Sequence, residues 1–177
     1  PTGNGAAGYT MPLPEKDEMF ITKGQLLQDI MVSLGGRIAE EIIFGDITTG
    51  ASSDIKKATS AARDMVTRYG MSENIGVINY NSDDDEVFIG RDLAHAKNHS
   101  ELISGEIDRE VKAIIDDCYK KAKDIILAHM DILHHCAELL IVKEKIGREE
   151  FEALFDQKEN DPESFFKNHE IGESAQK

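Results

Sequence analysis

Apolar side chains recur at helical spacing along most of the chain. Between residues 22 and 44 they fall on one helical face, at Leu26, Leu27, Ile30, Met31, Leu34, Ile38 and Ile42. The same spacing returns over 53–70 and 98–130, and two shorter segments, 131–145 and 148–155, continue it. A period near 3.6 places such residues on one face of a helix, which must then be buried against another helix. The sequence therefore predicts a mainly α fold of antiparallel helices.

Two glycines interrupt the first of these segments. Thr22 and Gln25 have the spacing of a capping box at its start, and Gly45 marks its end. Each glycine in a helix interior costs about 0.5–1 kcal/mol relative to alanine. The pair Gly35 and Gly36 therefore needs a structural reason, and we expect close approach of another helix.

Two segments depart from the helical pattern. Residues 6–10, "AAGYT", predict a short N-terminal edge strand. The stretches "IGVINY" and "EVFIG" flank the acidic turn "NSDDDE", and they predict a small β/loop insertion near 75–90. Polar residues predominate over 157–177, where we expect a disordered tail. A chain of 177 residues is long enough for one sizeable core.

The net charge of −14 excludes several classes of partner. No basic cluster is dense enough for nucleic acid, and the same sign disfavours contact with an anionic membrane surface. No apolar run approaches the roughly 20 residues that span a bilayer. Cys118 and Cys136 lie on apolar helical faces, so we expect reduced core thiols. Because Pro1 is not an initiator Met, we expect a cut end there.

Several short motifs have simpler explanations than a binding site. "GNGAAG", residues 3–8, lacks the preceding strand and following helix of a dinucleotide site. "HAKNH", residues 95–99, has metal-ligand spacing, but Ala96 stands where a hydrolytic H-E-x-x-H motif has its glutamate. "NSDDDE" lacks the ligand spacing of a calcium loop. Three further histidines flank a predicted helix–helix turn, where surface and helix-end roles are expected: His129, His134 and His135.

Asp54 follows a run of small residues, "TTGASS", at the start of the second predicted helix. A carboxylate there stabilises the helix dipole by about 0.3–1 kcal/mol. On a helical wheel, however, it aligns with small or apolar residues rather than with the lysine-rich side: Ala58, Ala61 and Met65. Ser52 or Ser53 is available to cap the helix. The pattern therefore leaves two interpretations for Asp54, a dipole partner or an inward-facing metal ligand.

Three stretches resemble the peptidase domain of the FtsH family: "GYTMPLPE", "GGRIAEEIIFGDITTGASSDIKKAT" and "RYGMSENIG". The resemblance covers about residues 1–156. It implies a membrane-anchored, ATP-dependent zinc metalloprotease whose zinc is held by two His of an H-E-x-x-H helix and by one Asp. That Asp corresponds to Asp54. The H-E-x-x-H motif is absent from the 177 residues, so no catalytic residue is expected in this chain. In the family the motif lies upstream, as do the ATPase module that binds ATP and Mg²⁺ and the transmembrane segments.

The resemblance also implies partners and a location. Ala7, Gly8 and Tyr9 of the edge strand would bind an unfolded polypeptide as an added strand. The full-length protein would form a homo-oligomer, expected to be a hexamer, on the cytoplasmic face of the bacterial inner membrane. This segment alone would be inactive and without membrane contact. The alternative function is a catalytically inert helical oligomerisation module.

Overall fold

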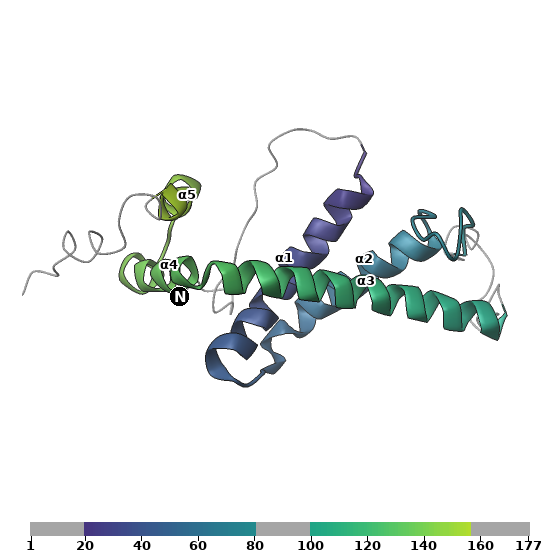
Figure 1. Cartoon of the computed structure of the whole chain (residues 1–177), viewed down its shortest axis with the longest axis horizontal. Helices are drawn as coiled ribbons and strands as arrows, with labels where there is room; N and C mark the ends of the chain where they lie inside the picture. The colour runs from purple at the N-terminus through teal and green to yellow at the C-terminus, as the bar shows by residue number, and fades with distance from the viewer. Residues whose placement is uncertain (1–19, 81–99, 157–177) are drawn as a thin grey trace, which may run out of the picture.

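The described part of the structure, a computed structural model, comprises residues 20–80 and 100–156 and is built from helices (Figure 1). Their order is α1 Lys23–Phe44, the 3-10 turn η1 Thr49–Ala51, α2 Ser52–Thr67, α3 Glu101–Ala128, α4 Met130–Lys143 and α5 Arg148–Asp156. Thr22 accepts a hydrogen bond from the Gln25 amide at the start of α1, and Gly45 ends that helix at φ 62°. The prediction of a mainly helical fold is confirmed for the described residues.

The predicted β/loop insertion near 75–90 is wrong as far as the structure describes it, because residues 75–80 contain no strand. Gly70 and Gly76 have positive φ angles of 60° and 78°, which turn the backbone back onto the end of α2. The Tyr80 amide then donates to the Thr67 carbonyl at 2.8 Å, across the helix end. Residues 81–90 lie outside the described residues, as does the predicted edge strand 6–10.

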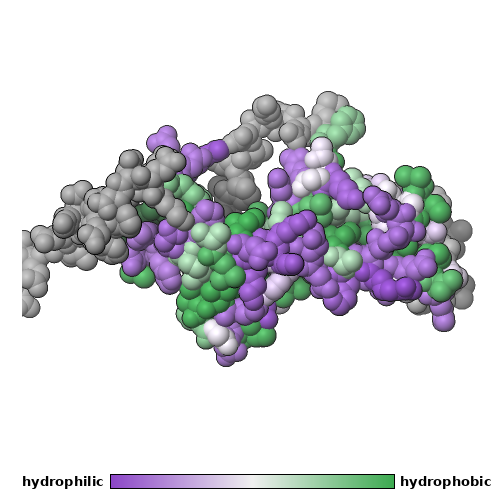
Figure 2. All heavy atoms as spheres, viewed as in Figure 1, coloured by the Kyte–Doolittle hydropathy of each residue, from purple (hydrophilic) through white to green (hydrophobic). Residues whose placement is uncertain are grey.

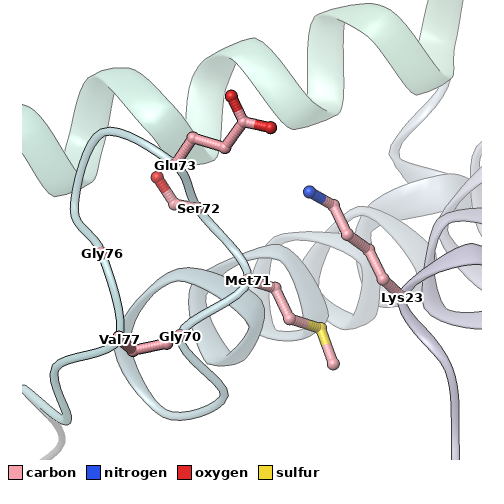
Figure 3. Close-up of a pocket in the computed structure, with 7 residues that line it drawn as sticks. All are labelled: Lys23, Gly70, Met71, Ser72, Glu73, Gly76 and Val77. Atoms are coloured by element: carbon pink, nitrogen blue, oxygen red, sulfur yellow. The ribbon is translucent and has the colours of Figure 1, made fainter.

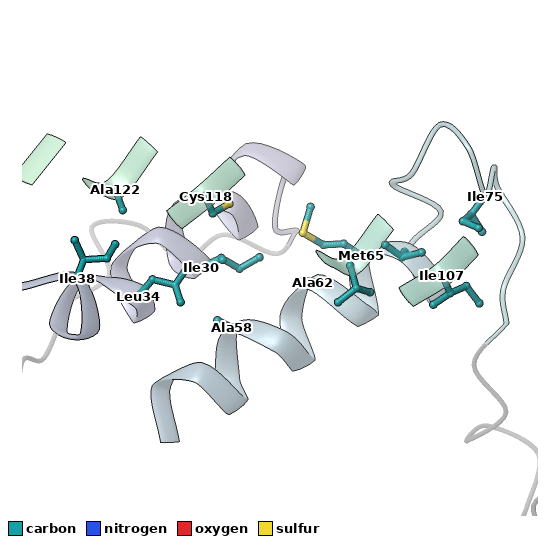
Figure 4. Close-up of a cluster of buried hydrophobic side chains, with 12 residues drawn as sticks. Ile30, Leu34, Ile38, Ala58, Ala62, Met65, Ile75, Ile107, Cys118 and Ala122 are labelled. Atoms are coloured by element: carbon teal, nitrogen blue, oxygen red, sulfur yellow. The ribbon is translucent and has the colours of Figure 1, made fainter. Parts of the chain in front are cut away.

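Helices α1, α2 and α3 pack together around one apolar core (Figure 4). The chain turns sharply after α1, so that α2 runs back beside it, and α3 then lies across both (Figure 1). Ala58 and Ala62 are buried on α2, and their small side chains let this helix approach its neighbours closely. The larger fully buried side chains are Ile30, Ile38, Met65, Val66, Ile107 and Cys118.

Both cysteines are free, but only Cys118 lies in the core as predicted; Cys136 is half-buried on α4 and lies outside the core cluster. The Cys118 thiol is buried in the core and lies 3.7 Å from the Leu27 carbonyl oxygen of α1. Burial is the main cause that raises the pKa of both thiols, so each is held as the neutral form. Cys118 and Cys136 therefore contribute as small apolar residues.

Helices α4 and α5 extend beyond this three-helix core (Figure 1). His129 lies at the junction of α3 and α4. Its ring packs edge-on against the ring of Phe155, with 5.6 Å between the ring centroids. Within residues 20–80 and 100–156, no single helix is long and apolar enough to cross a bilayer. Only α3 and α4 taken together pass such a test, and they are bent by 77°.

A polar cluster ties α1 to α3 at the edge of the core. Glu41 of α1 accepts hydrogen bonds from the Lys123 ammonium, at 2.8 Å, and from the Tyr119 hydroxyl. Lys123 is the larger cause that lowers the pKa of Glu41, followed by Tyr119, and the same contacts raise the pKa of Lys123 and of Tyr119. The charged carboxylate is therefore the form that the folded chain prefers.

This cluster predicts how acid weakens the fold. A carboxyl whose pKa is lowered on folding stabilises the native state above its unfolded pKa, here about 4.5, and loses that contribution as pH falls through the folded pKa. We expect Glu41→Gln to lower the urea midpoint at pH 7. The gap to the parent chain should close as the pH is lowered below 4.5.

The matched control is Glu138→Gln, which changes an exposed carboxylate on α4. It should leave the urea midpoint within experimental error of the parent at every pH. A gap for Glu41→Gln that stays constant from pH 7 to pH 3 would show that the contact does not depend on ionisation of Glu41.

Candidate metal centre

The turn that leads into α2 is held by one side chain of α1. The backbone amide and the hydroxyl of Thr48 both donate hydrogen bonds to the Glu40 carboxylate, at 3.2 and 2.9 Å. The Thr48 hydroxyl oxygen in turn accepts from the Gly50 amide at 3.1 Å, which caps the 3-10 turn. The end of α1 therefore fixes where α2 begins.

The small residues of "TTGASSD" have a steric reason in this turn. A Cβ on Gly50 would lie 3.1 Å from the Thr48 hydroxyl oxygen and 3.7 Å from Glu40 Oε1, so a side chain would crowd the contacts just described. Ala51 is buried beneath the turn. The expected serine cap is not observed: the N-cap of α2 is Ala51, without a side-chain hydrogen bond, and the capping hydroxyl is that of Thr48.

Asp54 lies in the first turn of α2, with its side chain 46% exposed. It stands at the rim of the alanine face, one turn from buried Ala58, and is not enclosed by it. Its Oδ1 atom accepts a hydrogen bond from the Lys57 ammonium at 3.2 Å.

Lys57 is a functional candidate that the sequence analysis missed. The helical wheel separated Asp54 from the lysine-rich side, yet the flexible Lys57 side chain reaches back one turn to the carboxylate. The sequence does contain a signal for this ion pair, because an acidic and a basic residue three positions apart lie on the same side of a helix.

Among the described residues, Asp54 stands alone as a possible metal ligand at the start of α2. A half-exposed carboxylate has the chemistry that zinc accepts from Asp or Glu. The described segments hold no group of three or more His, Cys, Asp and Glu side chains placed to share a metal ion. Asp54 therefore has the chemistry of one zinc ligand, and the described residues place no further ligands beside it. The pair His95 and His99 lies outside the described residues.

Exposed apolar residues surround the Asp54 end of the molecule. They occupy the end of α1, the turn and the start of α2: Ile43, Phe44, Ile47 and Ile55. Figure 2 shows this hydrophobic surface at the lowest part of the molecule, where α1 turns into α2. The close approach expected at Gly35 and Gly36 is not made by any described residue, since a Cβ at either position would meet nothing within 4 Å.

A shallow groove of about 400 Å³ lies at the other end of α2 (Figure 3). It is lined by Lys23, Gly70, Met71, Ser72, Glu73, Gly76 and Val77. Beside it, Glu110 of α3 accepts hydrogen bonds from Asn74 at 2.6 Å and Ser72 at 2.7 Å. These two contacts, Asn74 first, lower the pKa of Glu110. The polar groups here pin the segment after α2 to α3.

Comparison with known proteins identifies the family of the chain. Residues 1–154 match the profile of Peptidase family M41. A Caldicellulosiruptor bescii protein named ATP-dependent zinc metalloprotease FtsH is 50% identical over 149 residues, which cover 84% of this chain and 24% of that protein.

Two further relatives give the same result. The FtsH 1 protein of a Thermoanaerobacter species is 48% identical over 150 residues, or 85% of this chain and 24% of the relative. The FtsH protein of Thermotoga maritima is 42% identical over 154 residues, or 87% of this chain and 25% of the relative. The chain spans about a quarter of the length of these curated relatives. Because the family profile covers 154 of its 177 residues, the chain belongs to peptidase family M41, among the FtsH members.

Proposed function

We propose that these residues are the C-terminal part of a zinc-dependent endopeptidase domain, in which Asp54 is one of three protein ligands to zinc. The observation that carries the proposal is the place of Asp54: a half-exposed carboxylate in the first turn of a helix whose start is fixed by Glu40 and Thr48. The family match and the relatives named zinc metalloproteases support it.

The two missing ligands and the general base belong, in this proposal, to an H-E-x-x-H helix upstream in the same polypeptide. Zinc, when bound, supplies Lewis-acid polarisation of the scissile carbonyl and lowers the pKa of a water nucleophile. Asp54 contributes a negatively charged oxygen held at a fixed position. The Glu40–Thr48 contacts set that position by fixing the start of α2.

The exposed apolar surface near Asp54 supports the idea that another element covers this end. Ile43, Phe44, Ile47 and Ile55 are each at least 40% exposed. Such a concentration of exposed large apolar side chains is typical of an interface. We propose that the upstream H-E-x-x-H helix packs there, against the open side of Gly35 and Gly36.

The wider activity is proposed by analogy with the relatives named ATP-dependent zinc metalloproteases. The full-length protein would use ATP and Mg²⁺ in an upstream module to degrade unfolded or membrane proteins. It would be a membrane-anchored homo-hexamer on the cytoplasmic face of the bacterial inner membrane, with Ala7, Gly8 and Tyr9 binding the substrate strand.

One observation favours the alternative function, a catalytically inert helical oligomerisation module. On α4, Ile141 and Val142 are 81% and 73% exposed, although both are large and apolar. Exposed residues of this kind are typical of subunit contacts. As an inert oligomerisation module, the chain would assemble without binding zinc.

The test compares two polypeptides: the 177 residues alone, and the same residues with the upstream coding region. Alone, the chain should bind no stoichiometric zinc by elemental analysis and should not hydrolyse casein. The longer polypeptide should carry an H-E-x-x-H sequence, one zinc per chain and chelator-sensitive proteolysis. Chelator-sensitive proteolysis by the 177 residues alone would refute the proposed ligand set. Absence of the upstream motif, with assembly seen by light scattering, would favour the module.

A further inference from the structure

The side chain that contacts Asp54 carries the opposite charge. The Lys57 ammonium lies 3.2 Å from Asp54 Oδ1, and both side chains reach solvent, with exposures of 69% and 46%. Asp54 is the third residue of α2, where a carboxylate often bonds to the backbone at the helix start. Here the Asp54 carboxylate instead accepts a hydrogen bond from the Lys57 ammonium. Lys57 is thus a charged partner that contacts Asp54 directly.

An ammonium in this place opposes a metal in two ways. The Oδ1 lone pair that accepts the Lys57 proton is not available to a metal while the contact lasts. A unit positive charge about 3 Å from the carboxylate also repels a divalent cation. We propose that Lys57 is a positioning residue whose ammonium competes with zinc for Asp54, so that the contact between the two side chains must break before Asp54 can bind zinc. This inference rests on the proposed role of Asp54 as a zinc ligand.

Lys56 provides a matched comparison within the same helix turn. It is exposed, as Lys57 is, and carries the same charge one residue away. Within the described residues, the ion pair of this turn is made by Lys57 and not by Lys56. Any general effect of positive charge near the helix start is shared by both lysines, whereas direct competition for Oδ1 belongs to Lys57.

The experiment measures the zinc affinity of the full-length protein by equilibrium competition with a chromophoric chelator, with zinc as the only added ligand. Lys57→Met should tighten zinc binding by about two- to fivefold, the range for an exposed ion pair. Lys56→Met should give a smaller change. Lys57→Arg should weaken zinc binding, because a guanidinium binds a carboxylate through two parallel hydrogen bonds. High salt should reduce the difference between Lys57→Met and the parent.

The controls separate this inference from the proposal on which it rests. In an Asp54→Asn background, Lys57→Met should change zinc affinity no more than Lys56→Met does. Equal shifts for Lys57→Met and Lys56→Met, or no shift while Asp54→Asn weakens binding, would overturn the competition but leave Asp54 as a ligand. Unchanged zinc affinity in Asp54→Asn itself would overturn both.

Discussion

In the full-length protein, Asp54→Asn should abolish chelator-sensitive proteolysis and weaken zinc binding by roughly a hundredfold or more. Loss of a residue that merely supports a metal ligand typically costs about 10–100-fold in affinity, so loss of a direct ligand should cost at least as much. Asparagine keeps the size of the side chain and removes its charge, and the change lies at a half-exposed position of α2. Zinc content by elemental analysis, casein hydrolysis and ATP hydrolysis give the three readouts.

Asp64→Asn is the matched control for this change. Asp64 lies on the same helix and is also partly exposed, but it is ten residues beyond Asp54 and outside the helix start. It should keep zinc and proteolysis near parental values. ATP hydrolysis should persist in both variants, since the proposed ATPase module lies outside this chain. Full proteolysis by the Asp54→Asn protein would remove Asp54 from the site.

The helical part of the fold was predictable because apolar periodicity is a local signal. The expected helix over 22–44 corresponds to α1, Lys23–Phe44, and the Thr22 cap and Gly45 stop are observed where the pattern indicated them. The expected helix over 53–70 corresponds to α2, which ends at Thr67. The turn after it depends on Gly70, where a Cβ would lie only 3.0 Å from the Val77 Cα atom. This close contact between the backbones at Gly70 and Val77 depends on how the chain folds back, and no periodicity of apolar residues indicates it.

The strand prediction over 75–80 failed for a related reason. Val77 and Ile78 have high strand propensity, but propensity for strands depends on the available partners. Here the neighbouring backbone groups bond to the end of α2 and to the turn itself: the Tyr80 amide to Thr67 and the Gly76 amide to Ser72. Local preference is overridden by this packing against the helix end.

The candidate site was predictable only in part. Small residues before Asp54 indicated a tight turn, and the structure supplies its cause in Thr48 and Gly50. The contribution of Glu40 was not readable, because it depends on a reversal of the chain that brings residues eight apart into contact. The contact of Lys57 with Asp54 was missed because a helical wheel gives the direction of the Cβ atom and not the reach of a long side chain.

The second large effect concerns the core that holds α1 and α2 together. We expect Ile38→Ala to lower the free energy of unfolding of the 177-residue chain by about 2–5 kcal/mol. Ile38 is 0% exposed and belongs to the apolar cluster shared by α1, α2 and α3 (Figure 4). Removing three carbons there loses their transfer free energy and leaves a cavity that close-packed neighbours fill only partly. Urea unfolding followed by circular dichroism measures the change.

Ile43→Ala makes the same chemical change on the same helix, at a position that is 40% exposed. Because no comparable cavity forms at a partly exposed position, it should cost less than about 1 kcal/mol. Comparable losses for the two variants would show that the three-helix core does not carry the stability of the chain. A selective loss at Ile38 has a functional consequence, since α1 supplies Glu40 and packs against α2. Loosening that contact should release the start of α2, and with it the carboxylate of Asp54.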